Sequence, residues 1–307
     1  MNEIRIFCPA TIANVSCGFD VLGLCLDKVG DEMVIRKTGN NQVTISKIEG
    51  QDLPLDTEKN VAGVSALALL DHLGSTQGFD IEIYKKIKPG SGIGSSAASA
   101  AGAVFGINKL LGEPLSAREL IPFAMEGEKL ASGSWHADNV APALLGGFSL
   151  VRSYEPLDVI KLHTPGELYA SIIHPQIEVK TADARSVLKH SVPLKKAIQQ
   201  WGNVGGLISG LYTEDYDLIS RSLHDGIIEP LRSLLIPRFS LVKGAALEAG
   251  ALGSGISGSG PSIFALSRGE DTAQKVAEAM AGGYAGSGVD FDIHISGINP
   301  DGMRVLQ

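Results

Sequence analysis

The chain has 307 residues, 44% of them hydrophobic and 20% charged, which is typical of a globular protein and sufficient for two domains with separate cores. The formal net charge of −8 argues against a general nucleic-acid binder and against a protein that binds anionic membranes, because both normally present a basic surface. No apolar stretch approaches the ~20 residues that cross a bilayer, and the first residues lack the apolar core of a signal peptide, so we expect a cytoplasmic protein. Cys8, Cys17 and Cys25 follow no metal or redox spacing and are expected to be reduced thiols.

The spacing of apolar residues predicts an irregular series of helices and strands. In the first half it predicts a helix over 61–73 capped by Asn60, a strand over 80–87, helices over 96–111 and 116–131, and a strand over 147–152. In the second half it predicts strands over 168–173, 261–266 and 289–295, with helices in much of 182–250 and over 271–282. Because the two kinds of element do not alternate regularly, the pattern favours an α+β protein of two lobes. We place the domain boundary in the polar stretch 156–167, which gives domains 1–162 and 163–307.

The segment from Pro89 to Ser99, with the sequence PGSGIGSSAAS, predicts a phosphate-binding loop. It joins the predicted strand to a helix of small residues, and the start of a helix offers free backbone N–H groups and the positive end of the helix dipole. Glycines at 90, 92 and 94 let the backbone adopt positive φ and approach a phosphate closely. Ser95 and Ser96 supply hydroxyls for a phosphate oxygen or Mg²⁺. The alternative is a small-residue helix that only packs tightly on a sheet.

Two familiar nucleotide motifs do not fit the chain. A Walker A loop needs a Gly-Lys-Ser/Thr ending, and no lysine lies between Lys88 and Lys109. The segment 253–258 matches G-x-G-x-x-G, but a dinucleotide fingerprint runs strand, loop, helix, whereas here a predicted helix precedes the loop and a strand follows it. We expect residues 253–261 to form either a second backbone surface over the nucleotide or a flexible turn.

Polar residues gather in two further segments. Asn14 and Asp20 interrupt an apolar N-terminal run, where they are either ligand contacts or turn-forming residues. Glu128, His136, Asp138 and Asn139 follow one another closely, and this mixture of acid, imidazole and amide suits a metal or a polar substrate. Arginines such as Arg185 and Arg232 have the fork-shaped cation that a substrate carboxylate requires.

Three glycine-containing segments spread over 8–261 resemble, in this order, the three motifs of the GHMP kinases, a family of ATP-dependent kinases of small alcohols. The similarity is greatest to the members that act on homoserine. The matching segments are Ala13-Asn14, Gly18-Phe19-Asp20, Leu22-Gly23-Leu24, 126–128, 136–139, 181–185, 229–232 and 256–261. The chain departs from the family at Val15-Ser16-Cys17, where the family often has leucine, glycine and a small residue or proline.

This resemblance implies a two-domain fold, with an N-terminal lobe like the second domain of ribosomal protein S5 and a C-terminal ferredoxin-like α/β-plait lobe. It implies transfer of a phosphoryl group from ATP, with Mg²⁺, to the side-chain hydroxyl of L-homoserine, which gives O-phospho-L-homoserine on the route to threonine. It also implies a homodimer.

The resemblance assigns roles residue by residue. The triphosphate is expected at Pro89, Gly90, Ser91, Gly92, Ile93, Gly94, Ser95, Ser96, Ala97, Ala98 and Ser99, with Mg²⁺ at Ser96 and Glu128 and the adenine near Asn60. The acceptor's hydroxyl and ammonium groups are assigned to Asn14, Asp20, His136 and Asn139, and its carboxylate to Arg185 and Arg232, with Thr181 as a further candidate. Related kinases have an aspartate base where this chain has Asn139, and an amide cannot accept the proton, so the expected mechanism is direct attack by the hydroxyl.

Two other functions remain open at this stage. Paired arginines disfavour a neutral sugar as acceptor but not mevalonate, which also carries a carboxylate, whereas Asp20 favours an amino acid. A non-catalytic ATP or metabolite sensor on the same scaffold would not need both Ser96 and Glu128.

Overall fold

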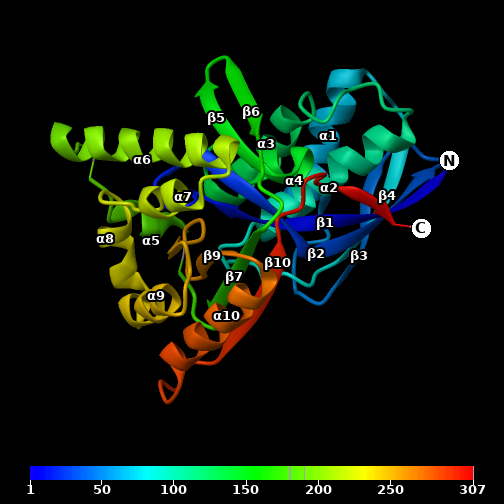
Figure 1. Ribbon diagram of the computed structural model, residues 1–307. Coiled ribbons are helices and arrows are strands. Elements are labelled where there is room, and N and C mark those ends of the chain that lie inside the picture. The colour runs from blue at the N-terminus through cyan, green and yellow to red at the C-terminus, as the bar shows by residue number, and fades with distance from the viewer. Residues whose placement is uncertain (180, 190, 307) are drawn as a thin grey trace.

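Two β-sheets organise the chain, which the computed structural model describes over residues 1–179, 181–189 and 191–306 (Figure 1). Within these residues the first sheet has seven strands, in the order β11-β1-β2-β4-β3, and β5 and β6 continue from β2. The strands are β1 (Glu3–Ala13), β2 (Leu22–Thr38), β3 (Val43–Glu49), β4 (Gly78–Tyr84), β5 (Phe148–Tyr154), β6 (Leu157–Leu162) and β11 (Arg304–Leu306). β1 and β2 are therefore central and bring the 14–21 connection to one end of the sheet.

Helices α1 (Val61–Leu73), α2 (Ser95–Leu110), α3 (Ile121–Ser132) and α4 (Val140–Leu145) cover this sheet. α2 lies directly against β1 and β2, and α1 and α3 pack beside it. The approach of α2 is close because a Cβ at Gly102 would stand 2.5 Å from the Cys8 sulfur, and one at Gly106 would stand 2.5 Å from Ile35. Small residues thus fix the position of α2, whose N-terminus opens on the predicted phosphate loop.

The second sheet has the order β10-β7-β9-β8 and forms the other lobe. Its strands are β7 (Leu168–Pro175), β8 (Gly253–Ile256), β9 (Ile263–Arg268) and β10 (Phe291–Gly297). Helices α9 (Phe239–Glu248) and α10 (Glu270–Tyr284) pack on it around a core that includes Val242, Met280 and Tyr284. Between β7 and α9 run α5 (Thr181–Ser186), α6 (Leu194–Thr213), α7 (Tyr216–Ser222) and α8 (Glu229–Arg232). Among the helices of the described chain, none is both long and apolar enough to span a membrane.

Most of the predicted elements are confirmed. The helix over 61–73 is α1, where the Asn60 side chain accepts a hydrogen bond from the Ala62 N–H at 3.0 Å and Gly74 ends the helix with φ 58°. The predicted start of the next helix at Ser116 is wrong. Ser116 and Glu119 do exchange capping-box hydrogen bonds, but they form a turn and α3 begins at Ile121. Pro122 sets this start, because proline has no N–H and fits the first turn of a helix.

Two segments of the second half differ from expectation. Residues 253–256, predicted as a loop, form strand β8, which pairs with β9 and is buried throughout. The glycines are required there by crowding, since a Cβ at Gly253 would stand 2.4 Å from Leu223. Residues 304–306, which we assigned to the C-terminal domain, form β11 and pair with β1 of the first sheet, so that Arg5 faces Leu306.

Candidate active site

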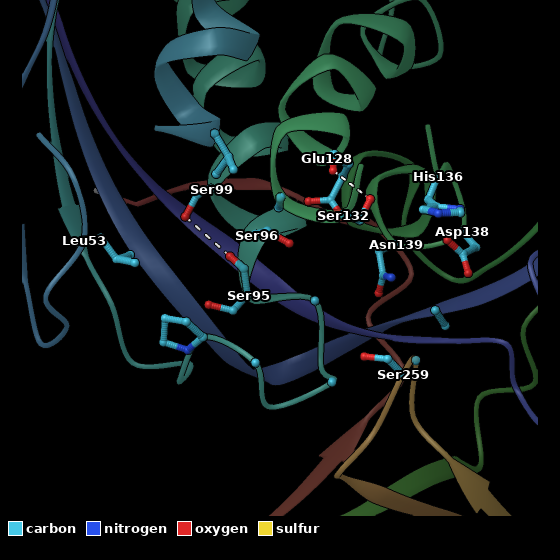
Figure 2. A pocket seen from close by; sticks show the side chains of 18 of the residues that line it. Leu53, Ser95, Ser96, Ser99, Glu128, Ser132, His136, Asp138, Asn139 and Ser259 are labelled. Carbon is cyan, nitrogen blue, oxygen red and sulfur yellow. Dashed lines mark hydrogen bonds between the residues drawn. The ribbon is translucent and has the colours of Figure 1, made fainter. Parts of the chain in front are cut away.

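A cavity of about 360 Å³ lies where the two lobes meet. The first lobe contributes the 14–20 connection, residues near Asn60, the predicted phosphate loop, α3 and residues 136–139. The second lobe contributes Arg185, Arg232, Gly258 and Ser259. Figure 2 shows Ser96, Glu128, His136 and Asn139 around this space, with Ser259 approaching from the other lobe.

The predicted phosphate loop has a backbone that only glycine adopts without strain. Gly90, Gly92 and Gly94 have φ of 74°, 83° and 71°. A Cβ at Gly92 would stand 2.6 Å from the Gly260 carbonyl oxygen, and one at Gly94 would stand 2.1 Å from the Thr11 hydroxyl. Gly94 is also the N-cap of α2 and provides no side-chain cap, so the first N–H groups of α2 remain available to an anion.

Ser96 and Glu128 form a site that suits a divalent cation. Glu128 lies on α3 and is 5% exposed, and within the described residues its Oε1 atom has no hydrogen-bond partner. Burial raises the pKa of this carboxyl group to about 7, while the neighbouring Ser96 hydroxyl acts in the opposite direction. A buried carboxylate with a free oxygen beside a hydroxyl fits Mg²⁺, which usually takes one or two protein oxygens and completes its shell with phosphates and water. No cluster of three or more His, Cys, Asp or Glu side chains that could hold a metal occurs among residues 1–179, 181–189 and 191–306.

Lys85, which the sequence analysis did not identify, binds the C-terminal part of the phosphate loop from the protein interior. Its ammonium group forms a fully buried ion pair with Asp31 and donates to the Ser95 carbonyl at 2.8 Å and to the Ser99 hydroxyl at 3.2 Å. The other Asp31 oxygen accepts the backbone N–H groups of Lys86 and Ile87 at 2.7 and 2.8 Å. Two buried charges, Asp31 in β2 and Lys85 just after β4, thereby fix the start of α2. The signal in the sequence was a charged pair at otherwise apolar positions, but the pairing of β2 with β4 is needed to recognise it.

The connection from Asn14 to Asp20 has an unusual backbone. Asn14, Val15, Ser16 and Asp20 all have positive φ, between 41° and 70°, and for a β-branched residue such as Val15 this is rare. The Asn14 side chain closes the turn by accepting the Asp20 N–H at 2.9 Å, and it donates to the Gly258 carbonyl of the second lobe at 2.7 Å. Asn14 therefore acts as a turn residue, which is one of the two roles expected from the sequence, and it also lines the cavity, while its contact with a ligand stays a prediction.

Asn139 is held in place from the first strand. Its Oδ1 atom accepts a hydrogen bond from the Thr11 hydroxyl at 2.8 Å, which fixes the orientation of the amide. Thr11 is the same residue that a Cβ at Gly94 would strike. Thr11 therefore contacts both the phosphate loop and the Asn139 amide.

Arg185 and Arg232 reach from the second lobe toward a single aromatic ring. Their guanidinium carbons lie 5.8 and 4.9 Å from the centre of the Phe19 ring. Arg185 also pairs with Asp20 at 3.0 Å and contacts the His136 ring at 3.0 Å. Arg232 donates to the carbonyls of Ala184 and Gly258, and burial lowers its pKa. Two cations, one carboxylate and one imidazole are therefore concentrated at this end of the cavity.

Asp138 and His136 have shifted protonation equilibria. Burial, reinforced by the charges of Asp20 and Glu128, raises the pKa of Asp138 to about 7. Burial and the charge of Arg185 lower the pKa of His136. Both side chains line the cavity, and shifts of this kind are frequent in active sites.

Most of the predicted site residues converge on the cavity. Those that line it are Asn14, Asp20, Asn60, Pro89, Gly90, Gly92, Gly94, Ser95, Ser96, Ser99, Glu128, His136, Asn139, Arg185 and Arg232. Ser91, Ile93, Ala97 and Ala98 are buried behind the loop, with Ile93 accepting the Thr11 N–H through its carbonyl. The side chain of Thr181 lies outside the described residues. Cavity residues that sequence reasoning missed include Lys85 and Leu53, whereas Gly258 and Ser259 belong to the segment 253–261, for which one expected role was a surface over the nucleotide.

The chain matches two protein families over most of its length. Residues 60–147 match the family described as GHMP kinases N terminal domain, and residues 207–286 match GHMP kinases C terminal. Homoserine kinase from Chloroherpeton thalassium is 48% identical over 319 residues, covering 100% of both chains. Homoserine kinase from Xylella fastidiosa is 38% identical, covering 99% of this chain and 94% of its own.

Solved structures give the same result for the fold. The crystal structure of homoserine kinase from Cytophaga hutchinsonii is 54% identical, has a TM-score of 0.96 and covers 100% of this chain and 98% of that chain. A mevalonate kinase has a TM-score of 0.72 at 15% identity, which shows a shared fold alone. The expected two-domain α+β kinase fold is thereby confirmed, and the chain belongs to the GHMP kinase family.

Proposed function

We propose that this protein is a homoserine kinase, which transfers the γ-phosphoryl group of ATP to the side-chain hydroxyl of L-homoserine and so serves threonine biosynthesis in the cytoplasm. One observation carries this proposal. A single cavity has a glycine-lined helix N-terminus on one side and, on the other, two arginines beside a carboxylate. The first arrangement suits a triphosphate, and the second suits an acceptor that carries both a carboxylate and an ammonium group.

The phosphate side positions the donor. Residues 89–99 and the first N–H groups of α2 receive the triphosphate, and the buried Lys85–Asp31 pair holds the loop in shape. We assign the adenine to the neighbourhood of Asn60, because Asn60 caps α1 and lines the cavity. Ser96 and Glu128 would hold Mg²⁺, whose chemistry is to neutralise the charge of the phosphates. Phosphoryl transfer depends mainly on such alignment and neutralisation.

The acceptor side selects and orients the amino acid. Arg185 and Arg232 bind the carboxylate, and Asp20 binds the ammonium group, so the substrate replaces the Asp20–Arg185 ion pair by one contact to each partner. Asn14 and Asn139 orient the hydroxyl. No side-chain base is needed, because in a loose transition state the proton leaves late, to a phosphate oxygen. If a side chain did accept the proton, Asp138, whose pKa is raised to about 7, would be the candidate base. Replacement of Asp138 therefore tests this mechanism.

Mevalonate kinase activity and a non-catalytic ATP sensor are the alternatives. Mevalonate has a carboxylate for the arginines but no ammonium group for Asp20. A sensor gives no reason for an unpartnered Glu128 oxygen beside Ser96.

The test is release of ADP from Mg·ATP with homoserine, mevalonate and galactose offered separately. We expect turnover with homoserine alone. Turnover with mevalonate instead would overturn the acceptor, and tight ATP binding without any turnover would favour the sensor. Asp138→Asn should keep kcat within about 10-fold of the wild type, whereas loss of a general base costs about 10²–10⁴-fold.

A further inference from the structure

Tyr154 is the last residue of β5, and its phenol reaches two backbone segments of the acceptor side. The hydroxyl donates a hydrogen bond to the carbonyl of Asp20 at 3.2 Å and accepts one from the N–H of Ala137 at 3.4 Å. The ring is partly buried against the core of the first lobe. Tyr154 is not one of the described residues that line the cavity, so it contacts the site only from behind.

A phenol hydroxyl suits this bridge because it is both a hydrogen-bond donor and a hydrogen-bond acceptor. Burial raises the pKa of Tyr154, and the charge of Asp138 adds to this effect, so the phenol keeps its proton at neutral pH. The proton serves the Asp20 carbonyl, and a lone pair of the same oxygen serves the Ala137 N–H. Phenylalanine would fill the same space and make neither hydrogen bond.

The bond to Asp20 holds an uncommon backbone conformation. Asp20 has φ 59°, in the left-handed region that most residues avoid. Its N–H donates to the Asn14 side chain at 2.9 Å and its carbonyl accepts the Tyr154 hydroxyl, so side chains hold both of its backbone polar groups. This backbone directs the Asp20 carboxylate toward Arg185, with which it pairs at 3.0 Å. Loss of one of the two holding bonds would let the backbone relax and carry the carboxylate away.

The bond to Ala137 holds the segment 136–139, which supplies the other first-lobe side chains of the acceptor side. Ala137 is fully buried, so its N–H needs a partner. Asn139 in the same segment is fixed separately, by the Thr11 hydroxyl. The phenol therefore sets the distance between this segment and Asp20, whereas the orientation of the Asn139 amide does not depend on it.

We propose that Tyr154 is a positioning residue for the acceptor, which holds the Asp20 carboxylate and the segment 136–139 at the separation that homoserine requires. The inference rests on the proposed function, which assigns Asp20 to the ammonium group of the acceptor. Loss of the hydroxyl should then weaken acceptor binding and leave ATP binding unchanged, because Lys85 holds the phosphate loop independently of Tyr154.

Steady-state kinetics of Tyr154→Phe tests this role. We expect the homoserine KM to rise by about 5- to 30-fold, as the loss of two hydrogen bonds implies, while the ATP KM and kcat stay within about 3-fold of the wild type. The matched control is Tyr284→Phe, which removes a phenol hydroxyl that donates to the Pro237 carbonyl at 2.8 Å in the second lobe and should leave both KM values unchanged. An unchanged homoserine KM in Tyr154→Phe, or an equal rise in both KM values, would overturn the proposal.

γ-Hydroxybutyrate, which is homoserine without its ammonium group, tests whether the phenol acts through Asp20. Its affinity can be measured from turnover or from competitive inhibition against homoserine. We expect Tyr154→Phe to weaken γ-hydroxybutyrate binding several-fold less than it weakens homoserine binding. Equal losses for the two compounds would indicate a general disturbance of the cavity and contradict the proposal.

Crystal structures of the wild type and of Tyr154→Phe give a measurement that does not depend on the reaction. In the variant we expect Asp20 to leave the left-handed region and its carboxylate to move beyond ion-pair distance of Arg185. An Asp20–Arg185 pair that keeps its geometry in the variant would overturn the positioning role. If the wild type does not phosphorylate homoserine, the proposed function is wrong, and this structural comparison still decides what Tyr154 does.

Discussion

The two sides of the cavity recognise their ligands by different means. The phosphate side uses backbone: three glycines with positive φ and the uncapped start of α2. The acceptor side uses side chains from both lobes, which include Asp20 and His136 from the first and Arg185 and Arg232 from the second. The residues of the phosphate side come from one lobe, although the Ser257 hydroxyl of the second lobe donates to the Gly92 carbonyl at 2.7 Å, whereas the acceptor side is made of side chains from both lobes. Donor binding and acceptor binding should therefore respond to different substitutions.

Arg232→Ala is expected to give the largest difference between the effect on acceptor binding and the effect on ATP binding. Removing one partner of a buried, hydrogen-bonded charge pair costs about 2–5 kcal/mol, so we expect the homoserine KM to rise by about 30-fold or more while the ATP KM stays nearly constant. Steady-state kinetics with each substrate varied in turn measures this. Arg238→Ala is the matched control, since Arg238 donates to the carbonyls of Gly283 and Ala285 and does not line the cavity. A rise confined to the ATP KM would refute the carboxylate role.

Asp138→Asn should change how stability depends on pH. The folded protein holds the pKa of Asp138 at about 7, above the ordinary value of 3.8, so it binds the proton more tightly than the unfolded chain does. The stability from this group is complete below about pH 4 and is lost as the pH rises through about 7, and the change amounts to about 4 kcal/mol. Urea unfolding across this range should show a larger fall in the wild type than in the variant, since Glu128, whose pKa is also raised to about 7, contributes to both. Parallel curves would show that Asp138 is not desolvated as described.

Gly94→Ala addresses the phosphate side. The substitution requires positive φ of an alanine and drives its Cβ against the Thr11 hydroxyl, at a cost of about 1–3 kcal/mol. We expect kcat/KM for ATP to fall by about 10- to 100-fold, with some loss in kcat because Thr11 also holds Asn139. Gly90→Ala is the control, since it has similar φ but open space around the new Cβ. Equal losses in both variants would show that the clash with Thr11 is unimportant.

Phe19→Leu should give the smallest effect of the four. The ring lies beside both arginine guanidinium groups, and each cation–π contact is worth about 0.5–2 kcal/mol. We expect the homoserine KM to rise by up to about 10-fold at unchanged ATP KM, and Phe19→Tyr, which keeps the ring, to restore it. Failure of Phe19→Tyr to restore the KM would indicate that packing, and not the aromatic face, matters at this position.

The same contrast explains what the sequence could predict. The phosphate loop is contiguous, and glycines before a small-residue helix have a local physical meaning, so residues 89–99 were identified directly. The functions of Arg185 and Arg232 depend on which residues the fold brings together, and only family resemblance pointed to them. Lys85 was missed for the same reason, since its partner Asp31 lies on another strand. Strand β8 was missed because its glycines have low strand propensity and are required by packing, Gly253 against Leu223 and Gly255 against Phe264.

The pairing of β11 with β1 has a consequence for motion. Because the chain leaves the first sheet after β6 and returns to it at β11, the second lobe is an insertion joined by two covalent crossings, at 163–167 and 298–303. The second crossing is tied down where the N–H of Asn299 donates to the carbonyl of Cys25 at 2.9 Å. A hinge rotation about these crossings would have to break the apolar core that the two lobes share, which includes Leu207, Leu211 and Phe264 of the second lobe. The adjacent ends of the chain also make the protein a good candidate for circular permutation, with a new terminus opened in a surface loop of the inserted lobe.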